Sequence, residues 1–474
     1  MYKGISIDIN KEGLVYMNKQ KRLGEEPILK LLLSFSIPAI VGMVVNTLYN
    51  IIDRMYIGRI EGIGPLALTG VGITMPIMTI ILAFGMLVGI GTAARVSLKL
   101  GEHNKDSAEE HLGNAFTLII IISIAITILG LMFLDPILGV FGASENTEIY
   151  ARQYMQIIFI GTIVNMLSFG LNHSIRSDGS PKVAMLSMLI GAITNIILDP
   201  VFIFGFGMGV RGAAIATVIS QILTTVWILQ YFTVGKSIIK LKMNNLKLKL
   251  PIIISIFSIG MSPFSMQLAA SVVQVLANNS LKEYGGDLAI GAMTIISSVS
   301  MIFLMPIFGI NQGSQPIIGY NYGAKQYDRV KETVKYGAIA ATIIVVIGWI
   351  ITQSAPQVLI AIFNNDPELV GIATNGIKIY LFMMPLVGFQ VISSNYLQSI
   401  GKAKISMFLS LLRQVILLIP CILILPKIFE LNGIWLSGAV CDGLSSLITG
   451  IIFFYSVKKL KVEEVEIKEG LEVS

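Results

Sequence analysis

The chain has 474 residues, of which 54% are hydrophobic and only 13% are charged, with a formal net charge of +6 and a mean hydropathy of +0.79. So few charged residues cannot cover the surface of a soluble globule of this length, which excludes that class of protein. Apolar runs of about twenty residues or more recur along the chain, whereas a membrane β-barrel would show alternating segments of about ten residues. The composition therefore predicts an all-α integral membrane protein.

The polar stretches between the apolar runs exclude several other functions. Their basic residues form small clusters, a pattern typical of membrane topology signals, so we expect no nucleic-acid partner. Residues 1–26 lack the apolar region of a signal peptide, and Met17 is an alternative start. The sequence has no phosphate-binding glycine loop, and its three histidines form no metal or nucleophile motif. We therefore expect neither an enzyme nor a bound cofactor.

Twelve apolar segments are long enough to cross a bilayer, and several are longer than needed and should tilt or protrude. They cover residues 29–53, 66–97, 112–134, 149–173, 183–205, 211–233, 250–280, 288–319, 336–361, 369–399, 403–425 and 431–457. Lys and Arg concentrate on one side of the predicted membrane, and the loops of the other side hold only Arg59, Arg211, Lys282 and Lys427. This asymmetry predicts a multi-pass protein of the cytoplasmic membrane with both termini in the cytoplasm.

The second half of the chain repeats the first half at an offset of 222 residues, from Phe35 to Phe257. The same ungapped register aligns glycines and loop charges, which chance alignment of apolar residues would not do. The pairs are Gly91 with Gly313, Gly101 with Gly323, Asp106 with Asp328, Gly179 with Gly401 and Lys182 with Lys404. Each copy holds six spans and enters the membrane in the same direction. We therefore expect two parallel six-helix repeats around a central cleft that forms the substrate path.

These features divide the chain into five segments. They are a cytoplasmic N-terminal segment (1–26), an N-lobe of six helices (27–235), a basic cytoplasmic linker (236–249), a C-lobe of six helices (250–458) and a cytoplasmic tail (459–474). The lipid bilayer is the expected environment of both lobes, and we expect the protein to be a monomer.

Two acids within the apolar spans mark a candidate site, because a charge inside a membrane must be paired, protonated or exposed at the interface. Asp53 lies near the end of the first span, and Asp199 lies in the fifth span one helical turn after Asn195. The predicted topology places both acids in the outer half of the membrane, together with Thr217 of the sixth span. Two carboxylates, an amide and a hydroxyl at one depth would bind either a proton or, as an oxygen cage, a sodium ion.

Each acid also has a structural interpretation. Pro200 removes a backbone donor, so Asp199 would then only accompany a kink in its helix. Asp53 would be an interfacial charge beside Arg54, although Arg54 lies about 100° round the helix and is a poor direct partner. In the second half, the charges within spans are Lys378, Arg413 and Asp442. We expect Arg413 and Asp442 to form a structural ion pair, and Lys378 to extend toward the lipid interface.

Together these motifs resemble the multidrug and toxic compound extrusion (MATE) family, within it the Gram-positive multidrug and DinF-like branch. The resemblance covers residues 27–460 and rests on motifs in the first, second, fifth and sixth spans. They are Phe35-Ser-Ile-Pro38 with Asn50-Ile-Ile-Asp53, then Gly91 and Gly101, then Asn195-Ile-Ile-Leu-Asp199-Pro200, and Gly209-Val-Arg-Gly212-Ala-Ala-Ile-Ala-Thr217. The family fold implied is one of twelve helices in two lobes.

The resemblance implies a secondary active antiporter that exports amphipathic, often cationic drugs and dyes by alternating access. The exchanged ion is H⁺ or Na⁺, and the sequence leaves this choice open. The family's N-lobe cation site matches Asp53, Asn195, Asp199 and Thr217, and the position where its first helix bends matches Pro38.

The chain departs from the NorM-like branch of the family, which carries additional acids in the C-lobe. At the repeat register Val275 replaces Asp53 and Cys421 replaces Asp199, so a second cation site in the C-lobe is in doubt. An alternative function is that of a lipid-linked oligosaccharide flippase of related architecture, which should line its cavity with several Arg or Lys. A third is a non-transporting scaffold, which would not need acids aligned at one depth.

Overall fold

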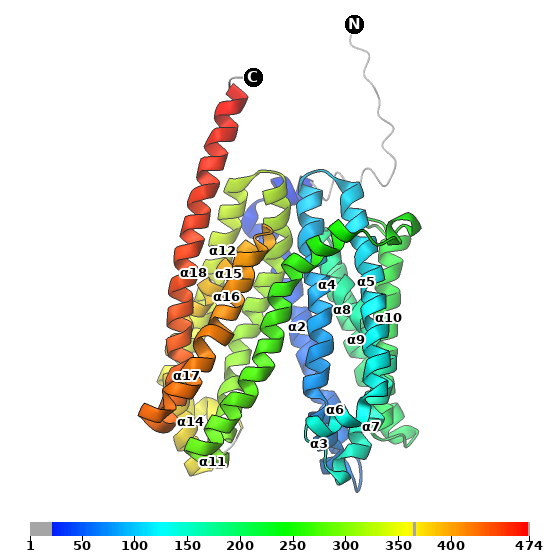
Figure 1. The fold of residues 1–474 in the computed structure, drawn as a ribbon, viewed down its shortest axis with the longest axis vertical. Coiled ribbons are helices and arrows are strands. Elements are labelled where there is room, and N and C mark those ends of the chain that lie inside the picture. The colour runs from blue at the N-terminus through cyan, green and yellow to red at the C-terminus, as the bar shows by residue number, and fades with distance from the viewer. Residues whose placement is uncertain (1–20, 364–365, 473–474) are drawn as a thin grey trace.

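The structure is a computed structural model that describes residues 21–363 and 366–472. This part of the chain is helical and contains no strand. Its helices are α2 (Ile28–Gly58), α3 (Gly64–Ile73), α4 (Met75–Gly101), α5 (Lys105–Met132), α6 (Leu134–Val140), α7 (Glu145–Ile160), α8 (Thr162–Ser177), α9 (Pro181–Pro200), α10 (Val210–Thr233), α11 (Leu250–Gly323), α12 (Tyr327–Ser354), α13 (Pro356–Ala361), α14 (Pro367–Tyr380), α15 (Met384–Ser399), α16 (Ala403–Leu411), α17 (Leu418–Ile424) and α18 (Pro426–Glu472) (Figure 1). Short π-helices, η1 (Val201–Gly205) and η3 (Leu412–Leu417), follow α9 and α16, and a 3₁₀ helix, η2, covers Met243–Leu246.

These helices provide the twelve predicted spans. Within the described residues, ten helical segments are long and apolar enough to cross a membrane singly, and two bent pairs each complete one more span. The pairs are α7 with α8, bent by 59°, and α14 with α15, bent by 52°. α11 supplies two of the spans, because Gly286 at φ +65° lets the chain reverse direction within it. The predicted all-α membrane fold is confirmed.

The predicted second span, 66–97, is wrong at its start. α3 ends at Ile73 and α4 begins at Met75, so two helices meet at Thr74 where the sequence suggested one. Pro76 explains the break, because a proline disfavours helical conformation in the residue before it and has no N–H for a helical hydrogen bond. The chain crosses the membrane as α4 alone, and α3 is a short apolar helix that packs against α7.

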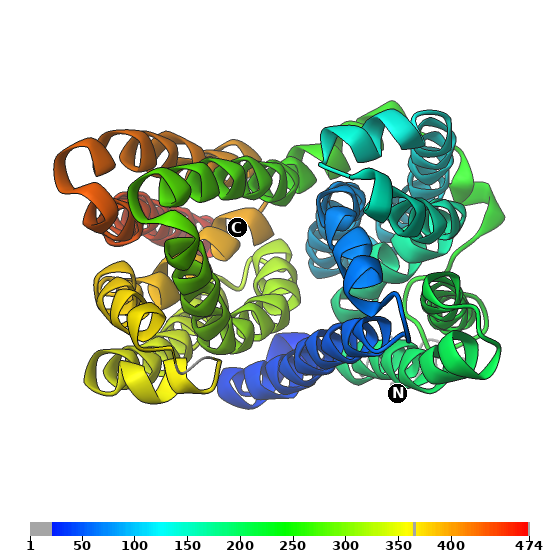
Figure 2. The same ribbon diagram turned by 90° about the horizontal axis from the view of Figure 1, so that it is seen from below.

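The helices form two lobes, which contact each other at one end of the molecule and separate toward the other end. Seen from below, α3 to α10 gather on one side and α11 to α18 on the other, and α2 runs along one edge between them (Figure 2). We call the end that carries residue 21 and the last turns of α18 the termini end. There the lobes lie together and the linker crosses from α10 to α11, whereas the helices diverge toward the opposite end, which carries α3 and α14 (Figure 1).

At the termini end α4 packs closely on α11 through two glycines that the repeat relates. A β-carbon added at Gly101 would lie 2.0 Å from the carbonyl oxygen of Tyr320, and one added at Gly323 would lie 2.2 Å from that of Leu98. Leu98 and Tyr320 occupy equivalent positions in the two repeats, so the contact is reciprocal. Glycine at these positions lets the two backbones approach more closely than any side chain would allow.

The linker is bound to the N-lobe by two buried acids. Asp178 accepts hydrogen bonds from the backbone amides of residues 238 and 239 at 2.8 and 3.0 Å. Glu109, which is 1% exposed, accepts from the backbone amide of Lys240 at 3.1 Å and pairs with Lys242 at 2.5 Å. Because a buried carboxylate requires such partners, the basic linker also compensates a charge inside the N-lobe.

Candidate functional site

Asp53 lies near the end of α2 and points into the N-lobe, with 8% of its surface exposed. Its neighbour Arg54 is exposed, and its guanidinium donates instead to the sulphur of Met75 at 3.2 Å. The interpretation of Asp53 as an interfacial charge paired with Arg54 therefore does not fit the geometry.

Pro38 is a buried residue of α2, fifteen residues before Asp53 in the sequence. α2 remains one helix from Ile28 to Gly58 in this structure. Because proline cannot donate the hydrogen bond to the preceding turn, this is the point of α2 that resists bending least. Its role as a hinge stays a prediction.

Asn195, Asp199 and Thr217 meet where α9 packs against α10. The side-chain nitrogen of Asn195 donates to Asp199 Oδ1 at 3.0 Å and to Thr217 Oγ1 at 3.4 Å. Asn195 and Asp199 are fully buried, and Thr217 is 7% exposed. Pro200 does not end the helix, which continues as the wider π-helix η1. Asp199 therefore keeps its place one turn after Asn195, and the kink alone does not account for it.

The structure places Asp53 beside this group, close enough for its carboxyl group to interact with that of Asp199. Three oxygens of the site are buried and accept no hydrogen bond from the described residues: Asp53 Oδ1, Asp199 Oδ2 and Asn195 Oδ1. Two ionised carboxylates in contact repel each other, so such a pair is stable when it shares a proton or holds a cation. Carboxylate, amide and hydroxyl oxygens are also the ligands that a hard cation prefers.

Two tyrosines that the sequence motifs did not single out border the site. Tyr154 on α7, which is 4% exposed, lies close enough to Thr217, Asp53 and Asp199 to interact with them electrostatically. Tyr49 lies one helical turn before Asp53 on α2 and interacts with it in the same way. The spacing of Tyr49 was readable from the sequence. Tyr154 reaches the site only through the packing of α7 against α10.

The corresponding region of the C-lobe is apolar and holds no such set among the residues described. Cys421 and Cys441 lie there as free thiols in a small cluster with Leu418 and Ile422. Nearby, Arg413 of η3 and Asp442 of α18 form a salt bridge, as the predicted ion pair requires, and its structural role stays a prediction. Lys378, expected within a span, lies in the last turn of α14, inside the bent α14–α15 pair, and its side chain is exposed. A cation at the end of a helix interacts favourably with the helix dipole.

The sequence matches one protein-family model and several known proteins. The family model described as MatE matches residues 38–201 and 263–423. Multidrug export protein MepA of Staphylococcus aureus (strain MSSA476) is 26% identical over 461 residues, which cover 97% of this chain and 99% of the relative. The protein of the same name from Staphylococcus saprophyticus is 27% identical with the same coverage.

Two solved structures show the fold over nearly the whole chain. The MATE multidrug transporter DinF-BH, in complex with a dye, matches with a TM-score of 0.85 and 39% identity, over 92% of this chain and 97% of that one. The outward-facing conformation of a multidrug resistance MATE family transporter of the MOP superfamily matches with a TM-score of 0.86 and 24% identity, over 94% and 99%.

The relatives are named multidrug export proteins, and the described residues form up to twelve spans in two lobes, so the chain is a membrane transporter and not an enzyme. The family model covers well over half of the residues, and a solved MATE transporter is 39% identical along nearly the full length. The chain belongs to the MATE family, and the family predicted from its motifs is confirmed.

Proposed function

We propose that this protein is a secondary active antiporter that exports amphipathic, often cationic drugs and dyes in exchange for H⁺ or Na⁺. The substrate class is supported by relatives named multidrug export proteins and by the dye complex of the 39% identical transporter. The observation that carries the coupling is the proximity of the buried carboxyl groups of Asp53 and Asp199, each with one oxygen that accepts no hydrogen bond from the described residues.

This acid pair links ion binding to the arrangement of α2. A proton or a sodium ion at the pair removes the repulsion between the two carboxylates and allows α2 and α9 to pack as observed. When the ion leaves, the two carboxylates are negatively charged, so they repel each other and attract a cationic drug. Competition of drug and ion for the same charge then couples their movements in opposite directions, because each ligand favours a different conformation.

The basic loops support an orientation with both termini in the cytoplasm. The linker lysines, Lys182 and Lys404 all lie at the termini end, and membrane proteins retain such residues on the cytoplasmic side. In this orientation the lobes are closed toward the cytoplasm and diverge toward the outside. The structure then represents the state in which the acid pair takes up its ion from outside.

Replacing either acid tests the proposal. Asp53→Asn and Asp199→Asn should each reduce drug efflux by about tenfold or more in a host that lacks its own pumps, because the pair can no longer alternate between charge states. Asp135→Asn is the matched control, since Asp135 is an exposed acid that pairs with Arg152 outside the site. The mechanism is wrong if the two site variants reach the membrane at normal levels and export drug at the normal rate.

The alternative, a flippase for lipid-linked oligosaccharides, requires a cationic site for an anionic pyrophosphate. The candidate site inside the N-lobe carries two acids, which would repel that ligand. Arg413, in the C-lobe, is already paired with Asp442. The acids therefore favour cation exchange over flipping of an anionic lipid.

A further inference from the structure

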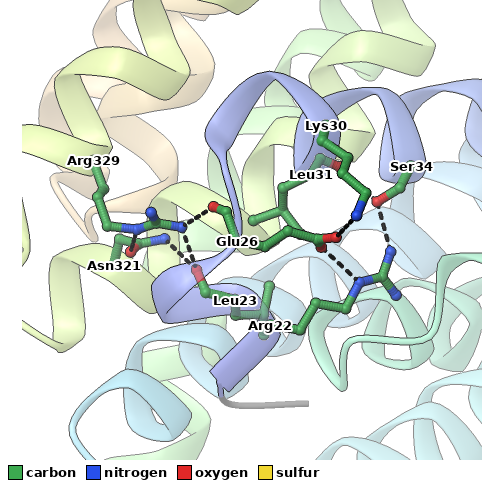
Figure 3. Close-up of polar contacts among 8 residues, drawn as sticks. All are labelled: Arg22, Leu23, Glu26, Lys30, Leu31, Ser34, Asn321 and Arg329. Atoms are coloured by element: carbon green, nitrogen blue, oxygen red, sulfur yellow. Dashed lines mark hydrogen bonds and ion pairs between the residues drawn. The ribbon is translucent and has the colours of Figure 1, made fainter. Parts of the chain in front are cut away.

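A short segment before α2 joins the two lobes at the termini end (Figure 3). We call residues 21–27 the N-terminal latch; residues 21–25 of it form a helical turn. Two of its side chains bind α2. Arg22 donates to Ser34 Oγ at 2.7 Å, and Glu26, which also accepts from Arg22 at 3.0 Å within the latch, pairs with Lys30 at 2.9 Å. The latch is therefore fixed to the first helix of the N-lobe and moves with it.

The opposite face of the latch is held by two side chains of the C-lobe. Arg329 of α12 donates through Nη2 to the carbonyl oxygens of Leu23 at 3.1 Å and Glu26 at 2.8 Å. Asn321 of α11 donates to the same Leu23 oxygen at 3.2 Å and accepts from Arg329 Nε at 2.8 Å. Figure 3 shows both side chains pointing at the latch backbone. Leu23 is 1% exposed and Asn321 is fully buried, whereas Arg329 and Glu26 are half-buried, so the junction is shielded from water on one side only.

These contacts between the lobes are directional hydrogen bonds from a charged group, unlike apolar packing. A guanidinium is a rigid fork, and here it serves two main-chain carbonyls and an amide at once. Hydrogen bonds from a charged donor are about twice as strong as neutral ones, and they lose strength steeply with distance and angle. A small separation of the lobes would therefore break the whole set together, and water would then satisfy the freed groups.

We propose that the N-terminal latch holds the termini end closed by docking on Asn321 and Arg329, and that its release is a step of the transport cycle. The proposal rests on the alternating access proposed above, since only that mechanism requires this end to open. It assigns to the segment before the first span a role in setting the balance between the two conformations.

The test measures the opening of the termini end directly. Spin labels are attached at Lys182→Cys and Lys404→Cys, which are exposed equivalent positions in the two repeats and lie on opposite lobes, in a background with Cys421→Ala and Cys441→Ala. Pulsed electron resonance on the full-length protein in lipid nanodiscs gives the distance distribution between the labels. A closed termini end gives a short distance and an open one a longer distance.

Arg329→Ala and Arg329→Lys should each increase the long-distance population by about fivefold, because neither side chain can serve the three acceptors at once. Asn321→Ala should act in the same direction. Lys335→Ala is the matched control, because it removes a cation from the same helix two turns further along, outside the set of contacts that holds the latch. Size-exclusion elution at the normal volume verifies that each variant is folded.

Distance distributions of the Arg329 variants that equal those of Lys335→Ala would overturn the proposal. Drug efflux is measured in parallel on the same proteins, so that the two proposals are tested separately. A shifted distance distribution with no ion-coupled efflux in the unmodified protein would support the latch and contradict the antiport function.

Discussion

Asn195 uses its side-chain nitrogen twice, for Asp199 and for Thr217, and its own carbonyl oxygen is buried without a donor among the described residues. One carboxylate oxygen on each of Asp53 and Asp199 is also buried without a donor among the described residues. A buried acceptor without a donor is unfavourable by about 1–3 kcal/mol, so three in one place indicate a group that gains its partner from a ligand. In the proposed cycle that ligand is the exchanged ion.

The salt bridge between Arg413 and Asp442 leads to a prediction about stability. Arg413→Ala and Asp442→Ala should each destabilise the protein, by about 3 kcal/mol where the remaining charge stays buried. The double variant should lose less than the sum of the two, by about 1–3 kcal/mol, because no unpaired charge is left. Denaturant unfolding of the four proteins in detergent measures this coupling. Additive losses would contradict the ion pair.

At the level of helices, the structure explains why glycine occupies four of the positions that align between the repeats. Gly101 and Gly323 let α4 and α11 pack backbone to backbone. Gly179 and Gly401 form the turns before α9 and α16, at φ +82° and +79°, a conformation that residues with a β-carbon rarely adopt. The repeat therefore duplicates this close backbone contact and these two turns, whereas the candidate ion site occurs in one copy only among the described residues.

Alanine at either contact glycine should open the termini end. Gly101→Ala and Gly323→Ala would place a methyl group 2.0 and 2.2 Å from a carbonyl oxygen, which forces α4 and α11 apart at a cost of about 2 kcal/mol. The long-distance population of the labelled protein should rise accordingly. Gly371→Ala is the control, because a β-carbon there meets nothing within 4 Å and α14 only gains helix propensity. An unchanged distance distribution in both contact variants would contradict the reciprocal packing.

The span count was predictable from the sequence because a bilayer requires about twenty apolar residues for each helix. The bends within α7–α8 and α14–α15 were not, since apolar runs continue through them. The four residues of the candidate site were found by their spacing and by the resemblance, but Tyr154 joins them only through tertiary packing. In the sequence Arg329 is one of many basic loop residues, and its contacts with the latch depend on how the two lobes meet.

The molecule as a whole is symmetric in fold and asymmetric in chemistry. Two six-helix lobes follow one pattern, yet Asp53 and Asp199 face each other in the first lobe while Cys421 lies in an apolar cluster of the second. The first helix connects these features, because α2 carries Asp53, contains Pro38 and begins beside the latch. We expect ion binding at Asp53 to be transmitted along this helix to the termini end.

The most direct test of ion exchange at the acid pair is dye transport by the purified protein in liposomes. The substrate is a cationic fluorescent dye, and a gradient of H⁺ or of Na⁺ is imposed across the vesicle membrane. One of the two gradients should drive the dye in the direction opposite to the flow of the ion. Collapse of that gradient, or Asp53→Asn or Asp199→Asn, should reduce the initial rate by about tenfold or more. Dye movement that persists at the same rate without either gradient, or in both variants, would contradict the account.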